Sequence, residues 1–87
     1  MRIDVRYFAA VREQLGSGEA LVFVDEASAP ATVGALRAHL IGLTPAHAEA
    51  LASDKALRMA LDQTLCAPEA TLHDGAEVAF FPPVTGG

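Results

Sequence analysis

The spacing of hydrophobic residues changes twice along this chain, and these changes limit the folds that it can adopt. Hydrophobic and polar residues alternate over residues 2–8 and again over residues 77–81, which predicts a half-buried strand near each end. Between these strands, hydrophobic residues recur at the spacing of a helix, at Val33, Leu36, Leu40 and Leu43. One face of that helix should pack on the sheet. The sequence therefore predicts an α+β fold, a single sheet covered on one face by helices.

Capping and turn residues divide the rest of the chain. Thr32 and Thr44 are suitable N-caps, and Gly16 is placed to stop a helix. The predicted strands cover residues 2–8, 19–24, 56–61, 64–67 and 77–81, and the predicted helices cover 9–15, 33 to about 40, and 45 to about 51. The expected core comprises Val5, Leu36, Leu40, Val78 and Phe80, with Leu57, Met59 and Leu61 also facing inward. Proline donates no ladder hydrogen bond, so Pro82-Pro83 should separate a domain over 1–81 from a flexible tail over 82–87.

Composition excludes several classes of function. The chain has 87 residues, the size of one domain, and 52% of them are hydrophobic, which is ample for a core. Its net charge of −5 disfavours nucleic acids and anionic membranes, which attract clustered Lys and Arg, and favours a basic protein partner. No apolar run approaches the length of a membrane span, and the first residues do not resemble a signal peptide. We therefore expect a cytoplasmic protein.

The sequence contains no internal catalytic or metal site that we would defend. Cys66 is the single cysteine and lies in a short apolar run, which is typical of a small buried hydrophobe. His39, His47 and His73 lie far apart without zinc-type spacing, and we interpret them as surface or helix-end residues. A glycine-rich phosphate loop is absent as well. We expect no enzymatic activity, no metal and no bound cofactor in this chain itself.

The C-terminal residues are the most distinctive part of the sequence. A frayed terminus is the ordinary interpretation of such a segment. However, Pro82-Pro83 favours an extended geometry, six residues beyond Phe81 can reach about 20 Å, and Gly86-Gly87 has no side chains to block entry into a narrow channel. A carboxylate at Gly87 is ionised at neutral pH and is a poor electrophile. Acyl chemistry there would require activation, for instance as an acyl-adenylate.

Two phenylalanines fall on the polar faces of their predicted strands. Phe8 shares a face with Arg2, Asp4 and Arg6, and Phe81 shares a face with Glu77. Exposed together, the two rings would form an apolar patch of the kind that marks a binding site. Alternatively, the short helix or a loop covers them. Strand phase alone leaves both interpretations open.

Three segments of the chain resemble the MoaD family, the small subunits of molybdopterin synthase. They are residues 6–13 (Arg-Tyr-Phe-Ala-Ala-Val-Arg-Glu), residues 60–65 (Ala-Leu-Asp-Gln-Thr-Leu, with Asp62 where Asn is expected), and the highly specific block 74–87. The resemblance implies a ubiquitin-like β-grasp fold, in which the first and last strands pair in parallel at the centre of a mixed sheet. Helices would pack on one face of that sheet.

The resemblance also implies a function in sulfur transfer. An E1-like adenylyltransferase would use MgATP to adenylate the Gly87 carboxylate, which would then become a thiocarboxylate. The tail would enter the large synthase subunit, in a heterotetramer of two small and two large subunits, and its sulfur would pass to cyclic pyranopterin monophosphate. The reacting end corresponds to Gly86 and Gly87. The residues that match partner-binding positions are Phe8, Arg12, Leu65, Phe81, Pro82, Pro83, Val84 and Thr85.

Other functions share the same activated end. A sulfur carrier for thiamine biosynthesis has the same fold and diglycine end, although the Phe-Phe-Pro-Pro-Val-Thr run favours the molybdopterin carrier. A protein modifier would be conjugated to lysines through the same carboxylate. A simple interaction module with an inert tail is the third class.

Overall fold

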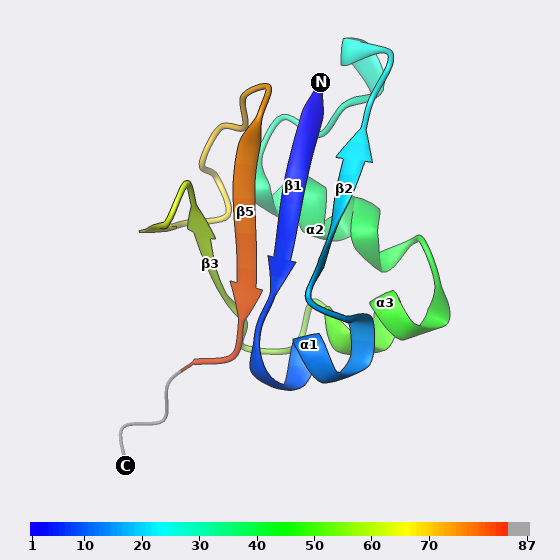
Figure 1. The fold of residues 1–87 in the computed structure, drawn as a ribbon, viewed down its shortest axis with the longest axis vertical. Helices are drawn as coiled ribbons and strands as arrows, with labels where there is room; N and C mark the ends of the chain where they lie inside the picture. The colour runs from blue at the N-terminus through cyan, green and yellow to red at the C-terminus, as the bar shows by residue number, and fades with distance from the viewer. Residues whose placement is uncertain (84–87) are drawn as a thin grey trace.

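The computed structural model describes residues 1–83 and forms a single sheet with helices against it (Figure 1). Its elements in chain order are β1 (Arg2–Tyr7), α1 (Ala9–Leu15), β2 (Gly18–Val22), the 3-10 helix η1 (Glu26–Ser28), α2 (Val33–Ile41), α3 (Pro45–Ala50), β3 (Arg58–Leu61), β4 (Thr64–Cys66) and β5 (Ala76–Phe81). Val84, Thr85, Gly86 and Gly87 lie outside the described residues, so the predictions for these four positions stay predictions.

The five strands are ordered β2-β1-β5-β3-β4. The first and last strands, β1 and β5, are neighbours at the centre and run parallel, whereas β2, β3 and β4 pair antiparallel with their neighbours. The parallel pair is possible because the intervening chain crosses over the sheet through the helices. This is the mixed sheet of a ubiquitin-like β-grasp fold, as the resemblance implied.

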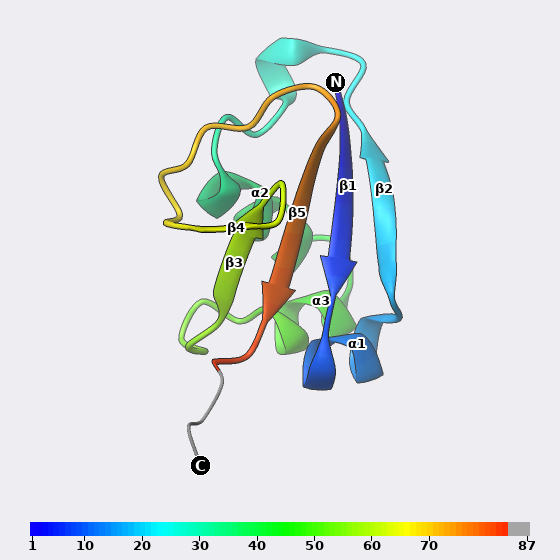
Figure 2. The same cartoon turned by 60° about the vertical axis from the view of Figure 1, so that its left-hand side comes forward.

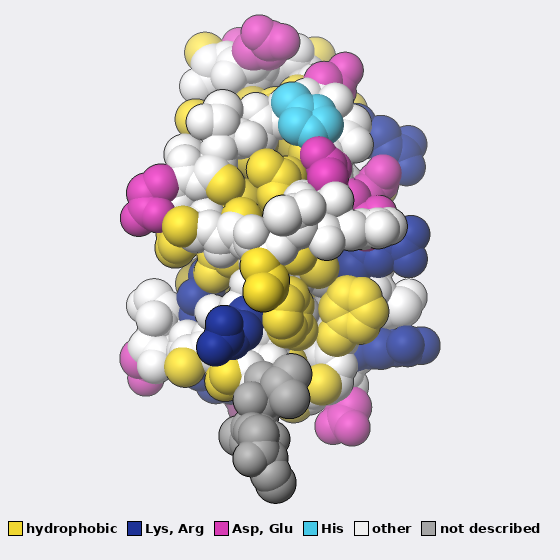
Figure 3. Space-filling model, turned by 90° about the vertical axis from the view of Figure 1, so that its left-hand side faces the viewer, with side chains coloured by type: hydrophobic (Ala, Val, Ile, Leu, Met, Phe, Trp, Pro, Cys, Tyr) yellow, Lys and Arg dark blue, Asp and Glu magenta, His cyan; other side chains and the backbone are white. Residues whose placement is uncertain are grey.

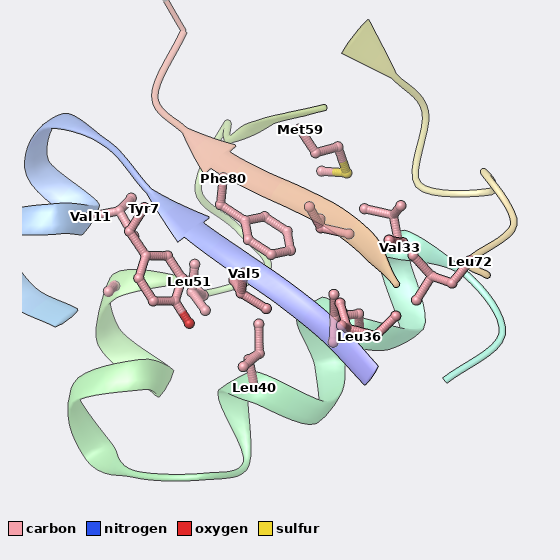
Figure 4. Packing of buried hydrophobic residues seen from close by; sticks show 14 residues of the cluster. Val5, Tyr7, Val11, Val33, Leu36, Leu40, Leu51, Met59, Leu72 and Phe80 are labelled. Atoms are coloured by element: carbon pink, nitrogen blue, oxygen red, sulfur yellow. The ribbon is translucent and has the colours of Figure 1, made fainter. Parts of the chain in front are cut away.

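The helices cover one face of the sheet, and the other face is left open (Figure 2). Thr32 begins α2 as predicted, since its side-chain oxygen accepts a hydrogen bond from the Ala35 N–H at 3.1 Å. The inward side chains of β1 and β5 pack against α2 and α3 (Figure 4). All five predicted core residues are at most 2% exposed, namely Val5, Leu36, Leu40, Val78 and Phe80. Met59 is also buried, and Leu57 and Leu61 pack against the same core.

The sequence-based prediction was wrong at Leu43, which we expected on the buried helix face. The helix α2 ends at Ile41 and the chain turns through Gly42, so Leu43 no longer follows the helical phase and is 43% exposed. The strands β1, β2 and β3 are each shorter than predicted, because their pairing with neighbouring strands covers fewer residues than the hydrophobic alternation. No helix within residues 1–83 is long and apolar enough to cross a membrane.

Candidate docking surface and carboxyl-terminal tail

The open face of the sheet carries the candidate docking surface. Because side chains alternate along a strand, β1 buries Ile3, Val5 and Tyr7 and turns the residues between them outward. The strand register then determines which outward residues are neighbours. Ala79 of β5 pairs with Ala60 of β3, and Ala60 pairs with Leu65 of β4. These small side chains join the outward residues of three strands into one apolar strip.

Phe8, Leu65 and Phe81 complete this strip, and we call the three together with Ala60 and Ala79 the apolar patch. Phe8 is 46% exposed and Leu65 is 64% exposed, while Phe81 is half-buried. The Phe8 N–H donates a hydrogen bond to the Phe80 carbonyl at 3.2 Å, which keeps Phe8 beside the end of β5. The short helix α1 therefore follows Phe8 without covering it. Of the two interpretations of Phe8, the one in which its ring is exposed is correct. Yellow hydrophobic side chains gather near the middle of the view in Figure 3.

Two open hollows flank Pro83, just after the end of β5. The strand β5 ends at Phe81, after which Pro82 is half-buried and Pro83 is exposed. One hollow, of about 450 Å³, is lined by Arg58, Leu65, Cys66 and Pro83 among others. The second, of about 260 Å³, lies against Pro82 and Pro83 and is lined by residues of α1 and of the segment 55–57. Arg12 is exposed on α1, one turn after Phe8. The predicted partner-binding residues within 1–83 thus lie on the surface around Pro82 and Pro83.

Arg37 supports one wall of these hollows, and the sequence reasoning did not find it. Its Nε–H donates to the Leu51 carbonyl at 2.9 Å, and its Nη2 donates to the Ala52 and Lys55 carbonyls. These three bonds bring a side-chain donor to carbonyls of the segment that follows α3, two of which also accept backbone N–H groups, from Lys55 and Leu57. They hold the segment that leads into β3. An arginine on an amphipathic helix gives no sequence signal for this role.

A second unforeseen cluster links β1, β2 and α3. The Tyr7 hydroxyl donates to Glu19 Oε2 at 2.7 Å, and His47 Nε2 lies 2.7 Å from the same oxygen. A carboxylate only accepts hydrogen bonds, so Nε2 of His47 carries the proton in this contact. In the neutral imidazole ring, Nδ1 is then an acceptor, and the Thr44 hydroxyl donates to it at 2.7 Å. His47 lies at the helix-end position that we expected, in the first turn of α3, but its side chain is only 13% exposed.

The cluster shifts the acidity of its members. Burial raises the pKa of Tyr7 far above its usual value, and its hydrogen bond to the Glu19 carboxylate acts in the same direction. For Glu19 itself, burial opposes ionisation, but hydrogen bonds from His47 and Tyr7 outweigh it and hold the pKa of the carboxyl below its usual value. The cluster thus stabilises an ionised Glu19 between the sheet and α3.

The remaining candidate groups do not assemble a site. His73 pairs with Asp62 at 2.6 Å on the surface, and His39 packs its ring against Phe23. Cys66 is partly buried, and burial raises the pKa of its thiol, which disfavours a reactive thiolate. Within residues 1–83, no three His, Cys, Asp or Glu side chains are placed to hold a metal ion together.

Comparison with known proteins shows the family of this chain. The model of the ThiS family matches residues 5–87, nearly the whole chain. This chain belongs to the ThiS family. One relative, the molybdopterin synthase sulfur carrier subunit of Escherichia coli, is 46% identical over 85 residues, which cover 98% of this chain and 99% of the relative.

Solved structures of similar proteins share the fold of this ThiS-family chain. The small archaeal modifier protein 1 of Haloferax volcanii superposes with a TM-score of 0.68 at 29% identity, over 95% of this chain and 98% of that one. A subunit in the complex of subunits 1 and 2 of the molybdopterin-converting factor from Helicobacter pylori superposes with a TM-score of 0.67 at 25% identity, with both chains fully covered. The sheet and the helical layer are therefore common to proteins with different names within this fold.

Proposed function

We propose that this protein is the sulfur carrier subunit of molybdopterin synthase and that Gly87 carries the sulfur. The observation that supports this most strongly is the 46% identity to the carrier subunit of Escherichia coli, which extends over 98% of the chain. The exposed apolar patch beside the root of the tail agrees with it, because a carrier must dock on each partner while its tail reaches an active site. Cytoplasmic localisation is part of the same proposal.

The chemistry of the tail requires a cycle of activation and transfer. The Gly87 carboxylate attacks the α-phosphorus of MgATP on an E1-like adenylyltransferase, which forms an acyl-adenylate and releases pyrophosphate. Sulfur delivered as hydrosulfide then attacks the acyl carbon and displaces AMP, which leaves a thiocarboxylate. Activation is needed because a carboxylate anion has no good leaving group. The chain itself contributes the acyl group and its delivery.

Sulfur transfer takes place on the partner in this proposal. The tail enters the large subunit, within a heterotetramer of two small and two large subunits, and its sulfur passes to cyclic pyranopterin monophosphate. The catalytic groups belong to the large subunit, and this chain is a non-catalytic carrier. The apolar patch, Arg12 and residues 82–85 contact the partner, and Gly86 provides the narrow passage that the end of the tail needs. The solved complex of the two Helicobacter pylori subunits supports a large-subunit partner.

Protein modification is a second candidate function, because the archaeal modifier protein shares the fold at 29% identity. Both functions begin with activation of the same carboxylate and differ in the nucleophile that accepts the acyl group. In a modifier, a lysine amine of a target protein attacks the acyl carbon and forms an isopeptide bond.

Mass spectrometry of the protein isolated from its own cells distinguishes these functions. The carrier function predicts a fraction of the intact chain in which one oxygen of the Gly87 carboxylate is replaced by sulfur. The fraction should disappear when the adenylyltransferase is deleted. Isopeptide-linked conjugates without any thiocarboxylate would support the modifier instead, and an unmodified end in all samples would contradict both.

A further inference from the structure

We propose that the apolar patch selects its partner through the arginines that border it, Arg6, Arg12 and Arg58, which we call the arginine rim. The complementary surface of the partner would then carry Asp and Glu carboxylates around an apolar centre. This inference rests on the proposed function, because it concerns the partner that docks on the patch. It differs from the expectation drawn from net charge, which favoured a basic partner. The two disagree because the charge on the docking face is unlike the charge of the molecule.

The open face of the sheet is positive although the molecule is negative. Its outward strand positions carry three arginines, Arg2, Arg6 and Arg58, against two carboxylates, Asp4 and Glu77. That difference is one net positive charge, whereas the whole chain has a net charge of −5. Most of the acidic residues are therefore elsewhere on the molecule. Local charge governs which surfaces approach at short range, because salt screens charges more than about 8–10 Å apart.

The arginines are concentrated at the end of the face that holds the patch. Arg58 pairs directly with Phe81 across β3 and β5, and Arg6 precedes Phe8 by two residues on the same face. Arg12 follows Phe8 by one turn of α1. The patch is therefore bordered by cations from three elements. Dark blue side chains lie on both sides of the yellow cluster in Figure 3.

These cations are available for a partner. Neither Arg12 nor Arg58 forms an ion pair within residues 1–83, and the Arg6 Nε lies 3.9 Å from Glu77, a long contact between partly exposed groups. Arg2, by contrast, pairs with Asp4 at 3.2 Å and lies at the opposite end of β1, away from the patch. Arg58 also lines the larger hollow beside Pro83. An acidic side chain of the partner could pair there with Arg58 as the tail is inserted.

Charge reversal tests the inference, with Arg2→Glu as the matched control for Arg58→Glu. Both replace an exposed arginine on the open face and change the net charge equally. Binding to the purified large subunit is measured by surface plasmon resonance at low and high salt. We expect Arg58→Glu to slow association about tenfold at low salt, with a smaller effect at high salt, and Arg2→Glu to change it by less than about threefold. Arg58→Lys, which keeps the charge, should associate at nearly the normal rate.

Phe81→Ala separates this inference from the proposed function. Weaker binding of Phe81→Ala together with normal binding of Arg58→Glu would leave the docking patch in place and overturn the arginine rim. Equal effects of Arg58→Glu and Arg2→Glu, or faster association of Arg58→Glu, would overturn it too. Normal binding by Phe81→Ala would contradict the proposed docking itself. Thermal unfolding of each variant shows that it is folded. Should Arg58→Glu not fold, the neutral Arg58→Gln replaces it, with an expected loss of about threefold in association rate.

Discussion

Phe80 and Phe81 are adjacent in β5 but have opposite roles, because successive side chains of a strand point to opposite faces. Phe80 is fully buried beneath the sheet, whereas Phe81 is half-buried on the open face beside Arg58. The same substitution at the two positions therefore separates folding from binding. We expect Phe80→Ala to lower the free energy of unfolding by about 3–5 kcal/mol.

Phe81→Ala should instead leave stability within about 1 kcal/mol and weaken binding to the large subunit by about 2 kcal/mol, roughly thirtyfold in Kd. Urea unfolding and calorimetric titration measure the two quantities on the same samples. A large loss of stability with normal binding in Phe81→Ala would show that Phe81 belongs to the core.

Glu19 should make the stability of the protein depend on acidity. Hydrogen bonds from His47 and Tyr7 hold the pKa of Glu19 below its usual value of 4.5. Its ionised form therefore stabilises the folded state above about pH 4.5, and this contribution is lost as the pH falls through the folded pKa. We expect Glu19→Gln to lower the free energy of unfolding by about 1 kcal/mol at pH 7, with a smaller difference from the unaltered protein at pH 3.5.

The control for this prediction is Glu13→Gln, which changes an exposed glutamate of α1. Its effect on unfolding in urea should stay within about 0.5 kcal/mol at both pH values. If Glu19→Gln differed from the unaltered protein equally at pH 7 and pH 3.5, the ionised carboxylate would not be the stabilising species.

At the scale of elements, the hairpin between β3 and β4 contains backbone strain that can be removed. Leu61 pairs with Thr64, so Asp62 and Gln63 form a two-residue loop, and both have positive φ, 50° and 69°. Such loops favour Asn-Gly, because a side chain with a Cβ costs energy in this conformation. We expect Gln63→Gly to raise the free energy of unfolding by about 0.5–1 kcal/mol.

The matched control is Gln14→Gly in α1, where the backbone is helical and exposed. The same change there should destabilise by about 0.5–1 kcal/mol. Both values come from urea unfolding. Destabilisation by Gln63→Gly would mean that the hairpin favours the glutamine side chain over the relief of strain.

The elements show which features of the fold could be predicted from sequence. Strand phase assigned the inward residues of β1 and β5 and the helical spacing assigned Leu36 and Leu40, because both patterns are repeated over several residues. The helical spacing gave a wrong prediction for Leu43, because it does not show where a helix ends, and α2 ends at Ile41. The parallel pairing of β1 with β5 came from the family resemblance, because no local pattern encodes contacts between distant strands.

The candidate docking surface could also be predicted only in part from the sequence. Phe8 and Phe81 were found because each is an apolar residue at a position that the strand alternation assigns to a polar face. Arg37 and the Tyr7–Glu19–His47 cluster were missed, because each depends on side chains from separate elements that only the fold brings together. The charge of the docking face was missed for the same reason. Net charge sums the charges of the whole chain, whereas a partner contacts only one face.

At the scale of the whole molecule, β1 begins at one end of the sheet and β5 finishes at the other. Because β1 and β5 run parallel, the start of β1 lies beside the start of β5, while Pro82 and Pro83 follow the far end of β5 (Figure 1). The N-terminal amine donates to the Phe23 carbonyl at 2.8 Å, away from the apolar patch. One glycine can therefore be added at either end, and only the addition after Gly87 should affect the reacting group.

The rate of molybdopterin formation by these extended chains tests the central claim most directly. Each chain is prepared as a chemically generated thiocarboxylate, shown to be intact by mass spectrometry, and mixed with purified large subunit and cyclic pyranopterin monophosphate. We predict that one glycine added before Met1 leaves the rate unchanged. One glycine added after Gly87 should slow it by about a hundredfold or more, because displacing a reacting group by an ångström costs about that factor. A normal rate from the chain extended after Gly87 would contradict sulfur transfer from a tail of this length.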